Sequence, residues 1–546
     1  MEKADVVITG DAVFTGLENL PVPGSIIIKE SIIVDICSKE ASQDYIGEKT
    51  EVINFKDELI MPGFHDFHVH LFLGSLYEDS VSLIDAKSEW EVALMVKEFA
   101  DQRPEDEWVF GFSWYHIYWD EKKLPHRSTL DKLLPDRPVL LMNAEGHGAW
   151  LNTKAMEMLG IDGNTVSPPF GEILKDANGV PTGVLYETAI SLAEKAFRVS
   201  PEKGERLLRQ FLQNANSLGI TSVSDMLPLT GYELGDVKLY KEFEQNDELS
   251  VRIHFLTVLN GDLTDAKRAR QTFNSDKLRF SGLKQFLDGV PTTYTALMID
   301  PYTDKPDTVG EAFLPPETVK KWIAEADKEG YRIRLHACGD GAVRLGLDAF
   351  EEARQKNGTR DSRHTIEHIE VIEPTDIPRF TELGVIASMQ PEHLNMEVFE
   401  ENVYLSRLGE ERSTYTWPVK SLQIAGAKLA FGSDYPIVDI NPMLGIYRAV
   451  TRVASDGEPI GGWNPAEKIH LAQVLQHYTS GSAYGVFEEN NVGTLEKGML
   501  ADITVLDRNL FTVGSEEILE TKVKMTIMDG QVVYNSELEF SLVKNS

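Results

Sequence analysis

The sequence predicts an α/β protein: a (β/α)8 TIM barrel with an inserted segment, and a small composite β-sandwich domain built from both ends of the chain. Strand-like and helix-like segments alternate through the middle of the chain, and both ends carry similar β-branched runs. In addition, histidines, a lysine and an aspartate follow short apolar runs at wide intervals. With 546 residues, 42% of them hydrophobic, the chain is long enough for a large barrel and a smaller module.

The two ends of the chain share one style of sequence. Short β-branched runs separated by turns occupy residues 6–8, 24–28 and 31–36, and similar runs occupy residues 498–506 and 523–533. We therefore assign residues 1–62 and 490–546 to one β-sandwich domain and residues 63–489 to the barrel.

Eight strand candidates fill the barrel, with helical patterns such as residues 316–328 and 343–355 between them. Eight such units are the number that closes a parallel barrel. The candidates are residues 59–64, 220–224, 251–256, 283–287, 331–335, 365–367, 385–389 and 428–431.

The gap between the first two candidates is too long for a single helix, so an insertion is expected at about residues 75–217. This segment is rich in aromatic residues, among them Trp108, Trp114 and Trp150. Two interpretations stand: the aromatic residues form the insertion's own core, or they line a pocket over the barrel mouth. On the second interpretation Trp114 binds substrate, and the substrate carries an apolar or aromatic group.

Composition excludes several classes of partner. The chain carries 53 Lys and Arg against 87 Asp and Glu, a net charge of -34, which argues against binding to nucleic acid or to an anionic membrane. There is no signal-peptide pattern and no apolar run of about 18 residues, so a cytoplasmic protein acting on a small molecule is expected. Two cysteines far apart in the sequence argue against a disulfide framework. Because two-fold dimers are the commonest assemblies, a homodimer is the default expectation.

Residues with metal-binding side chains follow predicted strands. In His68-Val69-His70, strand alternation places both imidazoles on one side, and Asp66 is placed to orient one of them. Catalytic groups of such barrels gather at the carboxyl ends of the strands. The pattern therefore predicts a divalent metal centre and a metal-dependent hydrolase, with the ligands His68, His70, Lys284, His336, His368 and Asp434.

Motifs along the chain resemble the amidohydrolase superfamily, specifically its YtcJ-like branch, which includes N-substituted formamide deformylases. The resemblance runs from about residue 5 to residue 535. The matching segments are residues 62–70, 146–152, 181–185 and 219–223, Lys284 with Asp288-Gly289, Gly339-Asp340 after His336, Gln390-Pro391 with His393, and residues 432–436, 493–498 and 501–502.

This resemblance implies roles for individual residues. His68 and His70 would hold a more buried zinc ion, His336 and His368 a more exposed one, with manganese or iron as other candidates. Lys284 would bridge both ions if carbon dioxide carboxylates its amine, because a free ammonium has no lone pair. The alternative is an unmodified Lys284 and a single zinc.

The resemblance also implies a reaction. Metal-activated hydroxide would attack an amide carbonyl, with Asp434 moving the proton to the leaving nitrogen. His147 would hydrogen-bond the substrate or the oxyanion, and His393 is a similar candidate.

The expected activity is hydrolysis of a carbon-nitrogen bond other than a peptide bond, in N-substituted formamides or related N-acyl amines. A lactonase, deaminase or cyclic amidase on the same scaffold is the alternative, because one hydroxide can attack any of these electrophiles. A different class also stands, a metal-binding regulatory protein, since the branch includes proteins described as regulators of exoenzyme production.

Overall fold

The computed structural model describes residues 2–144, 146, 148–168, 171–226, 235–394, 403–454 and 456–537. The chain divides into two compact units. The first comprises Met1–His70, Leu212–Leu227 and Tyr240–Ser546, and the second comprises Leu71–Phe211 and Pro228–Leu239. No helix among the described residues is both long and apolar enough to cross a membrane.

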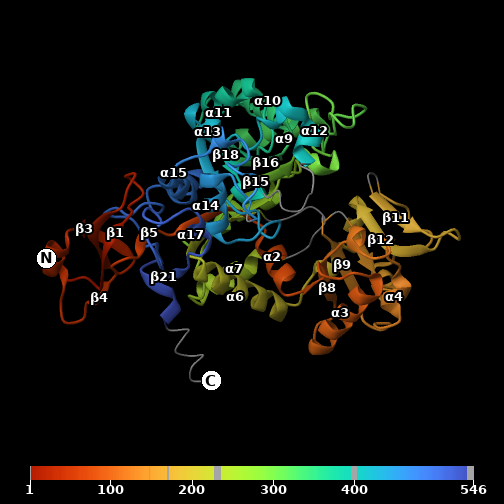
Figure 1. Ribbon diagram of the computed structural model, residues 1–546, viewed down its shortest axis with the longest axis horizontal. Coiled ribbons are helices and arrows are strands. Elements are labelled where there is room, and N and C mark those ends of the chain that lie inside the picture. Colours follow the sequence, from red (N-terminus) through yellow and green to blue (C-terminus); the bar gives the residue numbers. More distant parts are fainter. Residues whose placement is uncertain are drawn as a thin grey trace. The chain divides into compact units, whose positions relative to one another are not determined.

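The first unit contains the predicted parallel barrel. Eight strands pair with their neighbours in chain order, each pair parallel. Around β15, β16 and β18 lie helices that include α9 (Pro316–Lys328) and α10 (Asp340–Asn357) (Figure 1). The strands are β6 (Phe64–Val69), β13 (Ile220–Asp225), β14 (Arg252–Val258), β15 (Leu278–Phe286), β16 (Ile333–Ala337), β17 (Thr365–His368), β18 (Ile386–Met389) and β19 (Lys428–Phe431).

The barrel closes between its last strand and its first. The Asp434 N–H donates to the His68 carbonyl over 2.7 Å, and the His70 N–H donates to the Tyr435 carbonyl over 2.8 Å. These bonds join the segment that follows β19 to the end of β6. Two segments about 365 residues apart in sequence, each carrying predicted metal ligands, are thereby held side by side.

The first predicted barrel strand was wrong in position. Residues 59–62 form β5 (Leu59–Pro62), which belongs to the terminal β module and pairs with β20 (Ile503–Leu506). The barrel begins only at Phe64, after Gly63, where a Cβ would lie 2.2 Å from Thr221 Oγ1. The apolar run at residues 59–64 led to this prediction. The true barrel strand contains the polar residues His65, Asp66 and His68, so it lacks an apolar pattern.

Strands from both ends of the chain form one mixed sheet, which confirms that the termini build a single β module. Its order is β22-β21-β20-β5-β1-β2-β3, with β4 beside β1. Alternate residues face different clusters: Ile8, Ile26 and Ile28 pack with Ile503, whereas Val7 and Ile27 pack with Ala4. The other bounds are β1 (Val6–Val13), β2 (Val22–Lys29), β3 (Ile32–Cys37), β4 (Glu51–Asn54), β21 (Val523–Met528) and β22 (Gln531–Asn535).

The second unit has a sheet of its own, with the order β11-β12-β10-β9-β8-β7. Trp114, Trp119 and Trp150 pack together in its core, with ring centroids 6.0–6.4 Å apart. These three tryptophans thus form a core, as the first of the two interpretations had it, whereas Tyr118 is 47% exposed. The strands are β7 (Val81–Ser82), β8 (Val109–Trp114), β9 (Val139–Asn143), β10 (Gly148–Leu151), β11 (Gly171–Lys175) and β12 (Pro181–Glu187).

Candidate metal centre

The predicted ligands of the barrel converge at the carboxyl ends of its strands. His68 is the next-to-last residue of β6 and His70 follows the strand, His336 lies in β16, His368 ends β17, and Asp434 follows β19. His368 and Asp434 have positive φ angles of 74° and 69°, which only a few per cent of non-glycine residues adopt. Such backbone conformations cluster at functional sites, and here they turn the chain where a ligand leaves its strand.

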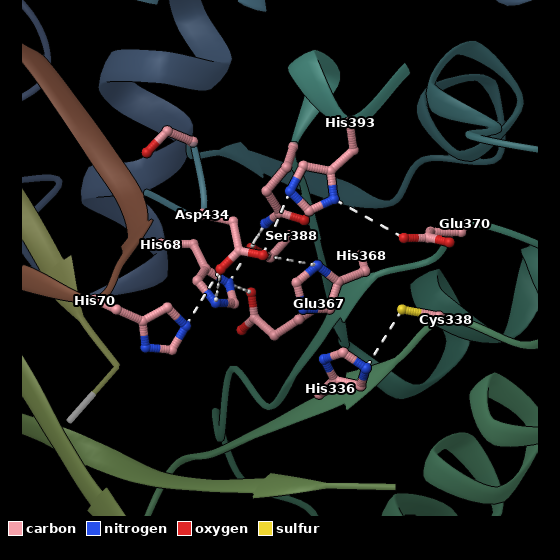
Figure 2. A network of polar contacts seen from close by, with 12 residues as sticks. His68, His70, His336, Cys338, Glu367, His368, Glu370, Ser388, His393 and Asp434 are labelled. Atoms are coloured by element: carbon pink, nitrogen blue, oxygen red, sulfur yellow. Dashed lines mark hydrogen bonds and ion pairs between the residues drawn. The ribbon is translucent and has the colours of Figure 1, made fainter. Parts of the chain in front are cut away.

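Asp434 is the centre of this cluster (Figure 2). Its Oδ1 lies 3.2 Å from His68 Nε2 and 3.2 Å from His70 Nε2. Its Oδ2 lies 3.3 Å from His393 Nε2 and 4.0 Å from His368 Nδ1. Ligand atoms of His68, His368 and Asp434 lie within 4.8 Å of one another, close enough to hold one ion.

Several nitrogens of this cluster are buried without a hydrogen-bond partner. They are His68 Nε2, His368 Nδ1 and Lys284 Nζ, whereas His393 Nε2 has the Asp434 carboxylate 3.3 Å away. Leaving a buried polar atom unpaired costs about 1–3 kcal/mol, so such atoms need an explanation when they gather at one place. Neutral imidazoles and carboxylates are the donors that divalent transition metals prefer, and the residues present therefore fit a divalent metal.

Glu367 sets the tautomer of His68. Its Oε2 lies 2.8 Å from His68 Nδ1, and both of its oxygens accept from the Arg334 guanidinium. Burial raises the pKa of a carboxyl, but Arg334 and His68 outweigh it and hold the pKa of Glu367 well below its usual range. The carboxylate keeps a proton on Nδ1, which leaves the Nε2 lone pair free for an ion.

Asp66 does not orient the ring of His68, as the sequence suggested, but its backbone. Its Oδ1 accepts the N–H of His68 over 3.1 Å and the N–H of Ser433 over 2.9 Å. The neighbouring Gly432 allows this close approach, because a Cβ there would lie 2.4 Å from the His68 nitrogen. One carboxylate thus fixes the two ligand-bearing segments against each other.

Lys284 points its amine into the buried cluster from β15. The side chain is buried, and burial lowers the pKa of its amine to about 8. A lysine with this pKa is neutral in a larger fraction of molecules than an exposed one, and only the neutral amine has a lone pair. This environment favours reaction of Nζ with an electrophile such as carbon dioxide.

His336 is held by the loops that follow β15 and β16. Its Nε2 lies 3.1 Å from the Gly289 carbonyl and 3.4 Å from Cys338 Sγ. Donation from Nε2 to the carbonyl leaves Nδ1 as the nitrogen with a lone pair. The Asp288 carboxylate, 3.8 Å from His336 Nε2, is occupied by the backbone N–H groups of Leu297, Cys338 and Gly339. Asp288 therefore holds the loops that follow β15 and β16 together.

His393 lies beside Asp434, in a chain of contacts that sequence reasoning missed. Its Nδ1 is 3.8 Å from Glu370 Oε1, and the Tyr404 hydroxyl donates to Glu370 over 2.6 Å. Burial disfavours the imidazolium, but Asp434 and Glu370 outweigh it and raise the pKa of His393 to about 9. The only sequence signal for Glu370 was its place two residues after His368.

His147, one of the predicted site residues, lies outside the described residues. Trp114 is fully buried in the core of the second unit, where its indole N–H donates to the Leu141 carbonyl over 2.9 Å, so this structure offers no face of its ring to a ligand. His65 of β6 stacks on His254 and contacts Ser224.

A parallel barrel with buried histidines, a lysine and an aspartate at its carboxyl end defines the metal-dependent hydrolase class. The chain belongs to the amidohydrolase family, whose profile matches residues 51–534.

Relatives and a solved structure agree with this assignment. The chain is 31% identical to Protein LONG AFTER FAR-RED 3 of Arabidopsis thaliana (97% of this chain, 92% of the relative) and 30% identical to the putative amidohydrolase YtcJ of Bacillus subtilis (96% and 98%). It is 26% identical to the N-substituted formamide deformylase of Arthrobacter pascens (89% and 90%). An uncharacterized metal-dependent hydrolase from Pyrococcus horikoshii superimposes with a TM-score of 0.79 at 25% identity (93% and 99%).

Proposed function

We propose that this protein hydrolyses a carbon-nitrogen bond other than a peptide bond, in an N-substituted formamide or a related N-acyl amine. The observation that carries the proposal is the convergence of buried imidazole nitrogens on the Asp434 carboxylate, with His68 Nε2 and His368 Nδ1 lacking a hydrogen bond. The similarity to an N-substituted formamide deformylase over most of both chains supports the choice of substrate.

Six residues would hold the divalent metal: His68, His70, Lys284, His336, His368 and Asp434. A bound divalent cation supplies Lewis acidity, which lowers the pKa of water and polarises a carbonyl oxygen. Zinc is the first candidate, because its preferred donors are imidazole nitrogen and carboxylate oxygen. Glu367 and Asp66 keep the ring and the backbone of His68 in place for this role.

Side chains of the protein transfer the proton from the attacking water to the leaving group. Asp434 accepts the proton of the attacking water and passes it to the departing nitrogen, because an amine leaves poorly unless it is protonated. His393 Nε2, 3.3 Å from Asp434 Oδ2, orients this carboxylate. Glu370 and Tyr404 in turn hold the His393 ring.

Lys284 would carry a carbamate, whose oxygens would add to the ligands that hold the divalent metal. The neutral amine attacks the carbon of carbon dioxide, a nitrogen-carbon bond forms, and one proton leaves, giving an anion with two oxygens. Its burial and lowered pKa support this assignment. In protein purified without chelator and supplied with bicarbonate, we expect about two metal ions per chain by plasma mass spectrometry, and about one in Lys284→Ala. Equal metal content in both proteins would contradict a role of Lys284 as a ligand.

The decisive test of the activity is a substrate panel with the metal-loaded protein. We expect release of amine from N-benzylformamide, and much slower reactions with lactones, cyclic amides and aminopyrimidines. Opening of a lactone or deamination of an aminopyrimidine, without amide cleavage, would replace the proposed reaction with another on the same scaffold. A fully metal-loaded protein that turns over no member of the panel would contradict this substrate class.

A further inference from the structure

Phe286 is an aromatic residue beside the candidate metal ligands to which no role has been given so far. It lies two residues after Lys284 in β15, so both side chains leave the same face of the strand. Its ring centroid is 5.4 Å from Lys284 Nζ and 4.7 Å from the centroid of the His336 ring. Phe286 therefore borders the ligand cluster at the carboxyl end of the barrel.

Phe313 extends this aromatic surface outward. Its ring centroid lies 5.9 Å from that of Phe286, and its side chain is 47% exposed. Single exposed apolar residues are common on protein surfaces, so exposure alone means little. Here the exposed ring is the outer member of a row that runs from His336 through Phe286 to solvent.

The segment that carries Phe313 is fixed to the barrel mouth. The Phe313 N–H donates to the Leu287 carbonyl over 2.8 Å, and the Met298 N–H donates to the Val309 carbonyl over 2.7 Å. At Gly310, with φ 71°, a Cβ would lie 1.9 Å from the Ala296 carbonyl oxygen, so only glycine allows the chain to pass. The position of the ring is thus preorganised, which reduces the entropy lost when a ligand binds.

We propose that Phe286 and Phe313 form a subsite for an apolar, preferably aromatic, substituent on the substrate nitrogen. This inference rests on the proposed function, since it assumes that the reacting carbonyl binds at the ligand cluster. A formamide carries only hydrogen on its carbonyl carbon, so a large apolar group must come from the nitrogen side. An aromatic substituent can stack on such rings in an offset or edge-to-face geometry.

The test compares N-benzylformamide with N-methylformamide in the metal-loaded enzyme. For the wild type we expect a higher kcat/KM with the benzyl compound. In Phe313→Ala the benzyl-to-methyl ratio should fall about tenfold while kcat/KM for the methyl compound stays within about twofold, because only the apolar contact is lost. Phe487→Ala is the matched control: Phe487 is 42% exposed and packs on Arg363, which precedes β17 at the opposite end of the barrel. Its ratio should equal that of the wild type.

Binding measured by calorimetry separates this inference from the proposed reaction. If neither formamide is hydrolysed but N-benzylformamide binds more tightly than N-methylformamide, and Phe313→Ala alone removes the difference, the subsite stands and the proposed reaction fails. A wild-type enzyme without benzyl preference in either assay overturns the subsite. So does a Phe313→Ala variant that keeps the preference.

Discussion

Two buried charged clusters of the first unit differ in how completely their polar atoms are paired. At the start of β14, Arg252 donates to both oxygens of Asp502, to Asp529 and to the Asp276 carbonyl, over 2.7–3.2 Å. At the other end of the barrel, His68 Nε2, His368 Nδ1 and Lys284 Nζ are also buried, but none of them makes a hydrogen bond. The first arrangement joins the barrel to the terminal β module, whereas the second is complete only with a bound ion.

The comparison shows how a buried charged cluster that stabilises the fold can be distinguished from one that binds a ligand. The criterion is whether its polar atoms are all hydrogen-bonded. In a fully paired cluster, no polar atom is free to bind a ligand. Removing one charged partner leaves the other charge buried and uncompensated in a low-dielectric environment. A cluster with unpaired atoms costs stability in the free protein and regains it on binding. Substitutions in the paired cluster around Arg252 should therefore reduce stability, whereas substitutions in the cluster around Asp434 should reduce activity.

The largest effect is expected from Asp434→Asn. An amide cannot take up the proton and is a poorer ligand, so kcat/KM for amide hydrolysis should fall about 10³-fold or more, with folding retained. The exposed Asp439→Asn, five residues later, is the matched control and should leave kcat/KM unchanged. A variant that keeps its metal and more than a tenth of wild-type activity would remove Asp434 from the chemistry.

Asp502→Ala should affect stability instead of chemistry. It leaves the buried Arg252 guanidinium with only Asp529 and the Asp276 carbonyl as partners, which should lower the free energy of unfolding by about 3 kcal/mol. Denaturant unfolding measures this loss, and kcat/KM per folded molecule should not change. As a control, Asp507→Ala removes a partly exposed ion pair with Arg508 and should cost less than about 1 kcal/mol. Equal losses in both variants would erase the distinction between the two clusters.

The sequence predicted the barrel and the terminal module because both depend on local patterns. Apolar runs mark strands, and ligand residues follow several of them. The first barrel strand was misplaced because β6 carries inward-facing polar residues, which hide it from a hydrophobicity pattern. Its pairing with β13 also shifts register between Phe64 and His65 and again between Asp66 and Val69, so simple alternation does not describe it.

The supporting residues of the site could not be predicted in the same way. Glu367 contacts His68 across 299 positions of sequence, and His393 reaches Glu370 and Asp434 from the segment after β18. Such pairs arise from the closure of the barrel and leave no periodicity in the chain. His368 could be recognised as a ligand candidate, but the role of the glutamate before it depends on which strand faces it.

Glu367→Gln tests whether the residue that contacts His68 Nδ1 contributes to metal affinity. A neutral amide holds the Nδ1 proton of His68 less firmly, so metal affinity should fall about 10- to 100-fold, as measured by competition with a chelating dye. Glu467→Gln is a suitable control, because Glu467 is also buried but accepts a hydrogen bond from the N–H of Ser421, which is not a candidate metal ligand. Unchanged affinity in Glu367→Gln would mean that the tautomer of His68 is fixed by other contacts.

The smallest effect should appear at Asp327, another fully paired carboxylate. Burial raises its pKa, but the contacts with His364, Asn357 and Arg360 outweigh it and lower the pKa to about 2 from the ordinary 3.8. Because the folded state favours the ionised form, this stabilisation is present above about pH 4 and is lost as the pH falls toward 2. The stability difference between the wild type and Asp327→Asn should therefore shrink by about 1–2 kcal/mol between pH 5 and pH 2 in denaturant unfolding. The exposed Asp307→Asn should follow the wild-type curve, and a difference at Asp327 that does not vary with pH would show that its contacts act through packing and not through charge.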